Sequence, residues 1–325
     1  MNTVTTTSTP PTTATARRRS HGVTLTSVLL WSLAATLGPQ AHAEKAPREQ
    51  AALFDYSAEA NVPALAGGVF QKARCCTITE WKLGKPDGDI DLTVVAPLGK
   101  VRKHPTVLWL HREGAEVKRA MFVQEAEALA SGGIASLLVE LPFKHPYVAR
   151  ADNIAGDADI IRSAVIDARR ALDWAATQPQ FDLTRLAVAG QRYGAWAAVL
   201  LTAVEPRIDA ALLMSPPGKP SGWLQVTEQP RAKAFRESFE KDAWIAYLNA
   251  IAPLDPENWI RFAAPAKLHF QFATRDAWAQ TLEQVDLYRA APTPKTRQLY
   301  ESDELLNDEA RKDRLAWLRQ VLLKR

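Results

Sequence analysis

The chain has 325 residues, of which 47% are hydrophobic and 23% charged, and this ordinary globular composition suits one large domain or two small ones. Its 40 basic and 36 acidic residues give a net charge of +4. Residues 1–43 hold three arginines and no acid, which leaves 37 basic against 36 acidic residues in the remainder. Because a nearly neutral chain lacks the basic surplus of nucleic-acid-binding proteins, we expect no nucleic-acid partner.

The first 43 residues have the pattern of a secretory signal peptide. Three consecutive arginines at 17–19 precede a short apolar stretch at 23–37, and Ala41-His42-Ala43 follows as a cleavage site. The apolar stretch is too short and too rich in Ser and Thr for a membrane span. We therefore predict an exported protein, periplasmic or extracellular, that begins at Glu44 and has no stable membrane span after cleavage.

An N-terminal extension at 44–74 leads to the only two cysteines, Cys75 and Cys76. Adjacent cysteines can form a disulfide only with a strained peptide, because the usual Cα separation exceeds one peptide step. Strand alternation would place one thiol inside and one outside, so we predict buried or incidental cysteines and no redox centre. No Cys/His spacing indicates a zinc site, and we expect no metal or cofactor.

From residue 75 onward, predicted strands alternate with predicted helices. The strands are expected at 77–81, 92–96, 106–111, 134–141, 185–189, 210–214, 268–273 and 296–301, and the helices at 117–130, 158–177, 193–204, 277–290 and 308–323. Several strands are continuous apolar runs, as in a sheet buried on both faces. This pattern predicts an α/β fold over 75–325, with a mostly parallel, doubly wound sheet flanked by helices.

One insertion interrupts the alternation. Residues 216–264 are rich in Pro and Trp, with a helical piece expected near 232–248. We predict that this segment forms a lid over the carboxyl edge of the sheet.

The stretch AGQRYGAW at 189–196 lies between an apolar strand and an apolar helix, which is the layout of a nucleophile elbow. The frame of Gly190 and Gly194 is intact, but the centre of the elbow is Arg192. An arginine does not lose its proton in a protein, so it cannot attack a carbonyl carbon.

Four further stretches accompany the elbow in a fixed order. The five are TVLWLHREG (106–114), FVQEAEALASGGIASLLVELPF (122–143), AGQRYGAW (189–196), FQFATRDAW (270–278) and LYESDELLNDEARKDRLAWL (299–318). Together they resemble the α/β-hydrolases, and within them the bacterial dienelactone-hydrolase-like and acetyl-xylan-esterase-like proteins. The resemblance covers the chain from about residue 75 to its end.

The resemblance implies a catalytic triad in the chain order Ser, Asp, His. The serine position is Arg192, the acid position is Asp276 and is intact, and the histidine position aligns with Glu304. No histidine follows His269. The turn that supplies part of the oxyanion hole also departs from the family, because Arg112 stands where glycine is usual.

Three other residues are candidates for the same site. The backbone N–H of Tyr193, directly after the elbow centre, is the group that normally helps to hold the oxyanion. His111 ends a strand near the site, and the resemblance implies a structural role for it. Ser215 would face the same cleft, but it has no base except His111 and no elbow to hold it.

The first functional hypothesis is a pseudo-hydrolase, in which an ion pair between Arg192 and Glu304 replaces the serine and histidine. A serine nucleophile needs a base to take its proton, and these two groups cannot exchange those roles. The second hypothesis is a carboxylic-ester hydrolase with non-standard machinery, in which Asp276 or Glu304 activates water.

The third hypothesis is a protein that binds a small anionic ligand. Arg112, Arg192 and Arg275 all follow strand ends, where such folds bind ligands, and arginines hold carboxylates or phosphates with paired hydrogen bonds. The alternative is that these arginines are paired internally with acids, for which Glu113, Glu304 and Asp276 are the candidates.

Overall fold

The computed structural model describes residues 45–57, 62–72, 75–85, 88–99, 103–279 and 281–324, with only the backbone described over 62–72 and at 281. All of these residues belong to one compact unit, 42–325. The predicted signal peptide at 1–43 lies outside the described residues. None of the described helices is long and apolar enough to cross a membrane.

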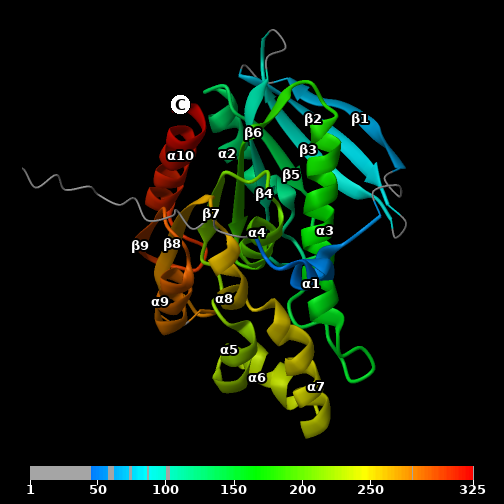
Figure 1. Cartoon of the computed structure of the whole chain (residues 1–325), viewed down its shortest axis with the longest axis vertical. Coiled ribbons are helices and arrows are strands. Elements are labelled where there is room, and N and C mark those ends of the chain that lie inside the picture. The colour runs from blue at the N-terminus through cyan, green and yellow to red at the C-terminus, as the bar shows by residue number, and fades with distance from the viewer. Residues whose placement is uncertain are drawn as a thin grey trace, which may run out of the picture. The chain divides into compact units, whose positions relative to one another are not determined.

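A single sheet of nine strands organises the described chain, in the order β1-β2-β3-β5-β4-β6-β7-β8-β9 (Figure 1). The strands are β1 (Val62–Lys72), β2 (Cys76–Gly84), β3 (Ile90–Pro97), β4 (His104–Leu110), β5 (Ala135–Val139), β6 (Phe181–Gln191), β7 (Ala210–Met214), β8 (Lys267–Arg275) and β9 (Lys295–Asp303). The pairs β1–β2, β2–β3 and β3–β5 are antiparallel, and all pairs from β5 to β9 are parallel. The predicted fold class, a mostly parallel α/β sheet, is confirmed.

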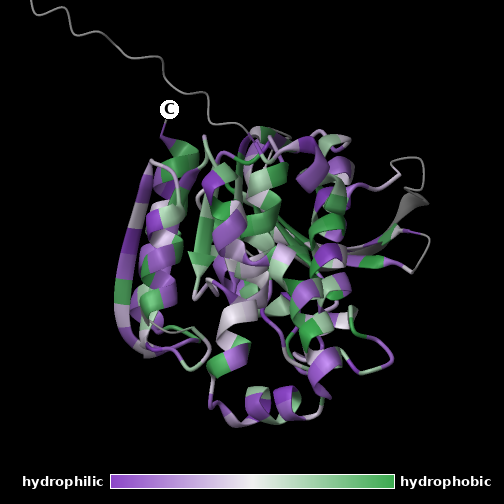
Figure 2. Cartoon of the chain, turned by 60° about the horizontal axis from the view of Figure 1, so that its bottom comes forward, coloured by the Kyte–Doolittle hydropathy of each residue, from purple (hydrophilic) through white to green (hydrophobic). Residues whose placement is uncertain are grey.

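Two core clusters lie on opposite faces of the sheet. The central strand β4 alternates between them: Leu108 and Leu110 belong to one cluster, and Val107 and Trp109 to the other. The first cluster includes residues of α3 (Gly156–Ala176) and α4 (Tyr193–Val204), and the second includes residues of α2 (Val123–Ala130) and α10 (Asp308–Leu323). Figure 2 shows the hydrophobic strands enclosed by helices with hydrophilic outer faces. The continuous apolar runs are thus explained by burial on both faces.

The N-terminal extension contains structure that the sequence did not predict. It holds α1 (Arg48–Ala51), η1 (Ala52–Phe54) and the edge strand β1, which pairs only with β2 and shows several register shifts. Pro63 and two consecutive glycines interrupt the apolar alternation of β1, and such residues are depleted in strands. Both cysteines are free thiols: Cys76 is buried, and Cys75 is half-buried beside it.

The insertion between β7 and β8 is helical. It contains α5 (Pro220–Val226), α6 (Pro230–Glu237), α7 (Lys241–Ile251), η4 (Ala252–Leu254), α8 (Pro256–Trp259) and η5 (Ile260–Phe262), and Figure 1 shows α5, α6 and α7 grouped at one end of the sheet. The single helix expected near 232–248 is instead two helices. The Ser238 hydroxyl bonds to the Phe235 carbonyl at the end of α6, and Glu240 is extended before α7.

Candidate active site and adjoining pocket

The predicted elbow lies between β6 and α4. Its central residue, Arg192, has φ 52° and ψ −111°, a left-handed backbone conformation that is uncommon outside glycine. The N–H of Arg192 donates to the carbonyl of Met214 at 2.9 Å, and its carbonyl accepts the N–H of Trp196 at 2.8 Å. The strained turn of a nucleophile elbow is therefore present with an arginine at its tip.

The elbow glycines are required by close packing. A Cβ atom on Gly190 would lie 2.2 Å from the carbonyl oxygen of Gly194, and one on Gly194 would lie 2.0 Å from the carbonyl oxygen of Leu110. No side chain fits at these separations, so only glycine allows α4 to begin this close to β4 and β6. This requirement is independent of the residue at the tip.

Two carboxylates hold the Arg192 side chain. Its Nε donates to Oε1 of Glu113 at 2.7 Å, and its Nη1 lies 3.1 Å from Oε1 of Glu304. The guanidinium carbon lies 4.5 Å from the ring centre of Trp278, within the range of a cation–π contact. The predicted ion pair of Arg192 with Glu304 is confirmed. Glu113 is the more buried partner, with 6% of its side chain exposed against 19% for Glu304.

Glu113 also contacts the group that would hold an oxyanion. The backbone N–H of Tyr193 makes a long hydrogen bond, 3.5 Å, to Oε2 of Glu113. In a working elbow, this N–H points at the developing negative charge of the tetrahedral intermediate. In the described structure, the Glu113 carboxylate therefore faces the Tyr193 N–H.

Asp276, the predicted acid position, follows β8 in a tight turn. Its Oδ1 accepts the backbone N–H groups of Trp278 at 2.8 Å and Ala279 at 3.0 Å. Burial raises the pKa of Asp276 to about 6, although these hydrogen bonds and the charge of Arg192 oppose the shift. Asp276 thus lies within electrostatic range of Arg192 and Glu304, but neither is its hydrogen-bond partner in the described structure.

His111 is structural. Its Nε2 accepts the backbone N–H of Leu141 at 2.9 Å, and its Nδ1 donates to the carbonyl of Arg112 at 2.8 Å. Burial lowers the pKa of His111, so the neutral ring is favoured. Because both ring nitrogens are already bonded, His111 is not available as a base for Ser215. The Ser215 hydroxyl is buried, with no hydrogen-bond partner among the described residues.

The predicted cluster of three arginines is not formed. Arg112 donates to the adjacent carbonyl of Glu113 at 3.1 Å. The side chain of Arg275 is 66% exposed and lies 3.6 Å from Glu301, which is 82% exposed. Only Arg192 lines the pocket beside the elbow. For Arg192, the structure shows the internal pairing with Glu113 and Glu304 that the sequence left open as an alternative.

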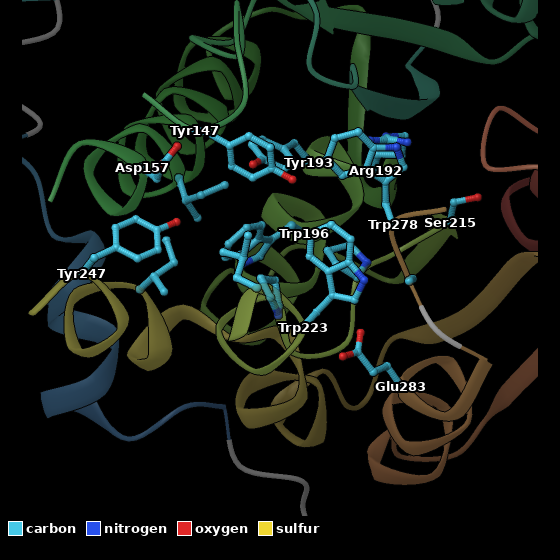
Figure 3. A pocket seen from close by; sticks show the side chains of 16 residues that line it. Tyr147, Asp157, Arg192, Tyr193, Trp196, Ser215, Trp223, Tyr247, Trp278 and Glu283 are labelled. Atoms are coloured by element: carbon cyan, nitrogen blue, oxygen red, sulfur yellow. The ribbon is translucent and has the colours of Figure 1, made fainter. Parts of the chain in front are cut away.

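An aromatic pocket with a cavity volume of about 40 Å³ adjoins the elbow (Figure 3). Its aromatic lining residues are Tyr147, Tyr193, Trp196, Trp223, Tyr247 and Trp278, and its charged ones are Asp157, Arg192 and Glu283. The insertion supplies Trp223 from α5 and Tyr247 from α7. The sequence analysis did not single out Trp223 or Tyr247, although the high Trp content of the insertion was a signal.

No cluster of three or more His, Cys, Asp or Glu side chains within the described residues is arranged to hold a metal ion.

No protein-family model matches the sequence, and no curated protein matches it. Several solved structures, in contrast, are similar to this chain. An acetyl xylan esterase from Paenibacillus sp. R4 has a TM-score of 0.69 at 16% identity, over 84% of this chain and 92% of that chain. Acetyl xylan esterase 1 from Thermoanaerobacterium sp. JW/SL YS485 has a TM-score of 0.67 at 12% identity, over 85% and 94%. A 2,6-dihydroxy-pseudo-oxynicotine hydrolase has a TM-score of 0.58 at 20% identity, over 75% and 67%.

These similarities confirm the predicted α/β-hydrolase fold of the chain. Within that fold, the architecture is like that of the acetyl xylan esterases. The narrower resemblance to dienelactone hydrolases stays a prediction.

Proposed function

We propose that this chain is an exported α/β-hydrolase-fold protein that has no serine-esterase activity and uses its cleft to bind a small molecule. The observation that carries the proposal is the tip of the elbow, where Arg192 is held between Glu113 and Glu304. An arginine in this position cannot act as a nucleophile.

The surroundings of Arg192 support the same proposal. No histidine follows His269 in the sequence, so the position of the triad base is filled by an acid. Glu113 accepts the Tyr193 N–H, which removes one donor that a tetrahedral intermediate would need. Losing single triad members already removes most of the rate in serine hydrolases, and here nucleophile and base are both replaced.

A second candidate, an ester hydrolase built on Ser215, is favoured by one observation. The Ser215 hydroxyl is buried without a hydrogen-bond partner in the described structure and lines the aromatic pocket. It lacks a histidine base, because His111 is engaged at both nitrogens.

The test is reaction with a fluorophosphonate probe, followed by peptide mass spectrometry, together with hydrolysis of p-nitrophenyl acetate and acetylated xylan. Acetyl esters are chosen because two of the similar structures are acetyl xylan esterases. We expect no labelling and no hydrolysis above background, with a working serine esterase as positive control. Labelling at Ser215, together with hydrolysis that Ser215→Ala abolishes, would instead establish the second candidate.

Export is tested separately. Mass spectrometry of the secreted or periplasmic protein should find an N-terminus at Glu44, after the Ala41-His42-Ala43 site. A cytoplasmic protein that keeps residues 1–43 would contradict the proposed export and leave the proposal on the cleft unchanged.

A further inference from the structure

Six of the sixteen residues that line the pocket beside the elbow are aromatic. The rings of Trp223 and Trp278 lie 5.7 Å apart between centres at 31°, and those of Tyr147 and Trp278 lie 5.9 Å apart at 27°. The face of an aromatic ring carries partial negative charge and attracts cations, most strongly for tryptophan. One such contact is already present, between Trp278 and the guanidinium of Arg192.

The charges around the pocket are predominantly negative. Arg192 is the one basic residue in its lining, and two carboxylates outside the lining, Glu113 and Glu304, already pair with it. Asp157 lines the pocket and accepts the N–H groups of Val148 and Ala149 at 3.0 and 3.2 Å. Glu283 adds a further carboxylate, so the lining offers no unpaired cation to an anionic ligand.

One carboxylate oxygen of Glu283 lacks a hydrogen-bond partner in the described structure. This atom, Oε2, is buried, and Glu283 lines the same pocket as Trp223 and Trp278 (Figure 3). A buried carboxylate oxygen without a partner is costly, and such atoms in native structures call for an explanation. Tyr147 and Ser215 present two more unpartnered buried hydroxyls from the same lining.

We propose that the pocket binds a small organic cation, an alkylammonium or arylammonium ion, with its charged group on the Glu283 carboxylate and beside the rings of Trp223 and Trp278. This inference rests on the proposed binding function and names the class of ligand for it. An uncharged ligand would leave the ionised Glu283 carboxylate unpaired. An anionic ligand would meet Glu283 and Asp157 without a free arginine to hold it.

Binding should strengthen as the pH rises through neutrality. Burial raises the pKa of Glu283 to about 7, and the charges of Asp255, Glu257 and Asp276 add to the shift while Lys219 opposes it. Below this pKa a proton occupies the carboxylate that the cation needs. A quaternary ammonium ion does not titrate itself, so its affinity should be higher at pH 8 than at pH 6.

The experiment uses three probes of nearly equal shape and different charge, measured by calorimetry on the full-length protein. They are choline, its uncharged carbon analogue 3,3-dimethylbutan-1-ol, and the anion 3,3-dimethylbutanoate. We expect choline to bind about tenfold more tightly than the alcohol, with no detectable binding of the anion.

Glu283→Gln should abolish this preference for choline and its pH dependence while the alcohol binds as before. The matched control Glu301→Gln, at an exposed acid outside the pocket, should change neither. Thermal unfolding of each variant checks that it folds, and Glu283→Asp, which keeps the charge, should retain the preference.

Equal affinity for choline and the alcohol, tighter binding of the anion, or no binding of any probe would overturn the inference. Choline binding combined with fluorophosphonate labelling would instead overturn only the proposed lack of esterase activity.

Discussion

Replacing Arg192 with methionine should destabilise the protein strongly, because the change leaves two carboxylates without their cation. The side chains of Arg192 and Glu113 are 7% and 6% exposed, whereas that of Glu304 is 19% exposed. Breaking a buried ion pair costs about 3–5 kcal/mol, and an exposed pair contributes about 1 kcal/mol or less. We therefore expect Arg192→Met to lower the free energy of unfolding by about 3–5 kcal/mol, mostly through Glu113.

Compensating variants distinguish the contribution of Glu113 to stability from that of Glu304. The sequence, which pairs Arg192 with Glu304, predicts that Arg192→Met/Glu304→Leu recovers most of the loss. The structure predicts little recovery, because Glu113 remains buried without a cation. The triple variant Arg192→Met/Glu113→Leu/Glu304→Leu should recover most of it, since apolar replacement of a complete buried charge network is often neutral or stabilising.

Urea denaturation with linear extrapolation to water measures all of these differences. The matched control is Arg275→Met, in which Glu301, 82% exposed, loses an arginine that is 66% exposed. That variant should lose about 1 kcal/mol or less. If Arg192→Met costs no more than this control, or the double variant recovers as well as the triple one, the buried charge network is not what stabilises the elbow tip.

Three further predictions follow from the same region. The double variant Arg192→Ser/Glu304→His rebuilds a triad in the order Ser, Asp, His, but Glu113 would still accept the Tyr193 N–H that an oxyanion needs. Hydrolysis of p-nitrophenyl acetate should therefore appear only when Glu113→Gly is added. Equal activity in the double variant would contradict this. Burial raises the pKa of Asp276 from 3.8 to about 6, so the folded state binds more protons than the unfolded state between these values and the unfolding free energy falls as the pH rises. Urea denaturation from pH 4 to 7 should show a smaller fall for Asp276→Asn, and an unchanged slope would refute the assignment. Gly194→Ala brings a Cβ to 2.0 Å from a backbone oxygen, so circular dichroism should find the variant largely unfolded, and a native-like melting curve would refute the packing argument.

The parallel half of the sheet could be predicted from the sequence because its strands and helices carry strong local signals. The strand at 210–214 and the helices at 193–204 and 308–323 match β7, α4 and α10 residue for residue. Each is either a continuous apolar run or an amphipathic repeat with a clear boundary. The edge strand β1 has no such local signal. Its place in the sheet depends on backbone hydrogen bonds to its partner β2.

The Arg192–Glu304 contact could be predicted because the resemblance places Arg192 at the serine position and Glu304 at the histidine position of the triad, and these two positions adjoin. The sequence named Glu113 among three candidate acids but could not select it as the partner of Arg192, because this contact depends on which strands are neighbours. β4 lies beside β6 with Leu110 opposite Gly190, so the segments that leave both strands emerge at one edge. Glu113 follows Leu110 by three residues and thereby reaches Arg192. Only the strand order β4-β6 makes this contact evident.

The elbow can persist without its chemistry because its shape is fixed by packing. Gly190 and Gly194 allow α4 to contact β4 at backbone distance, and nearly every side chain of α4 is buried. Losing that contact would disrupt the core, whereas the tip residue can change if its charge is balanced. Glu113 and Glu304 supply the balance for Arg192. Of the sixteen residues that line the aromatic pocket, six come from the insertion and two from α4, and only Arg192 holds a triad position, so most of the lining does not depend on an intact triad. This separation supports the proposed function, in which the cleft binds a small molecule without hydrolysing an ester.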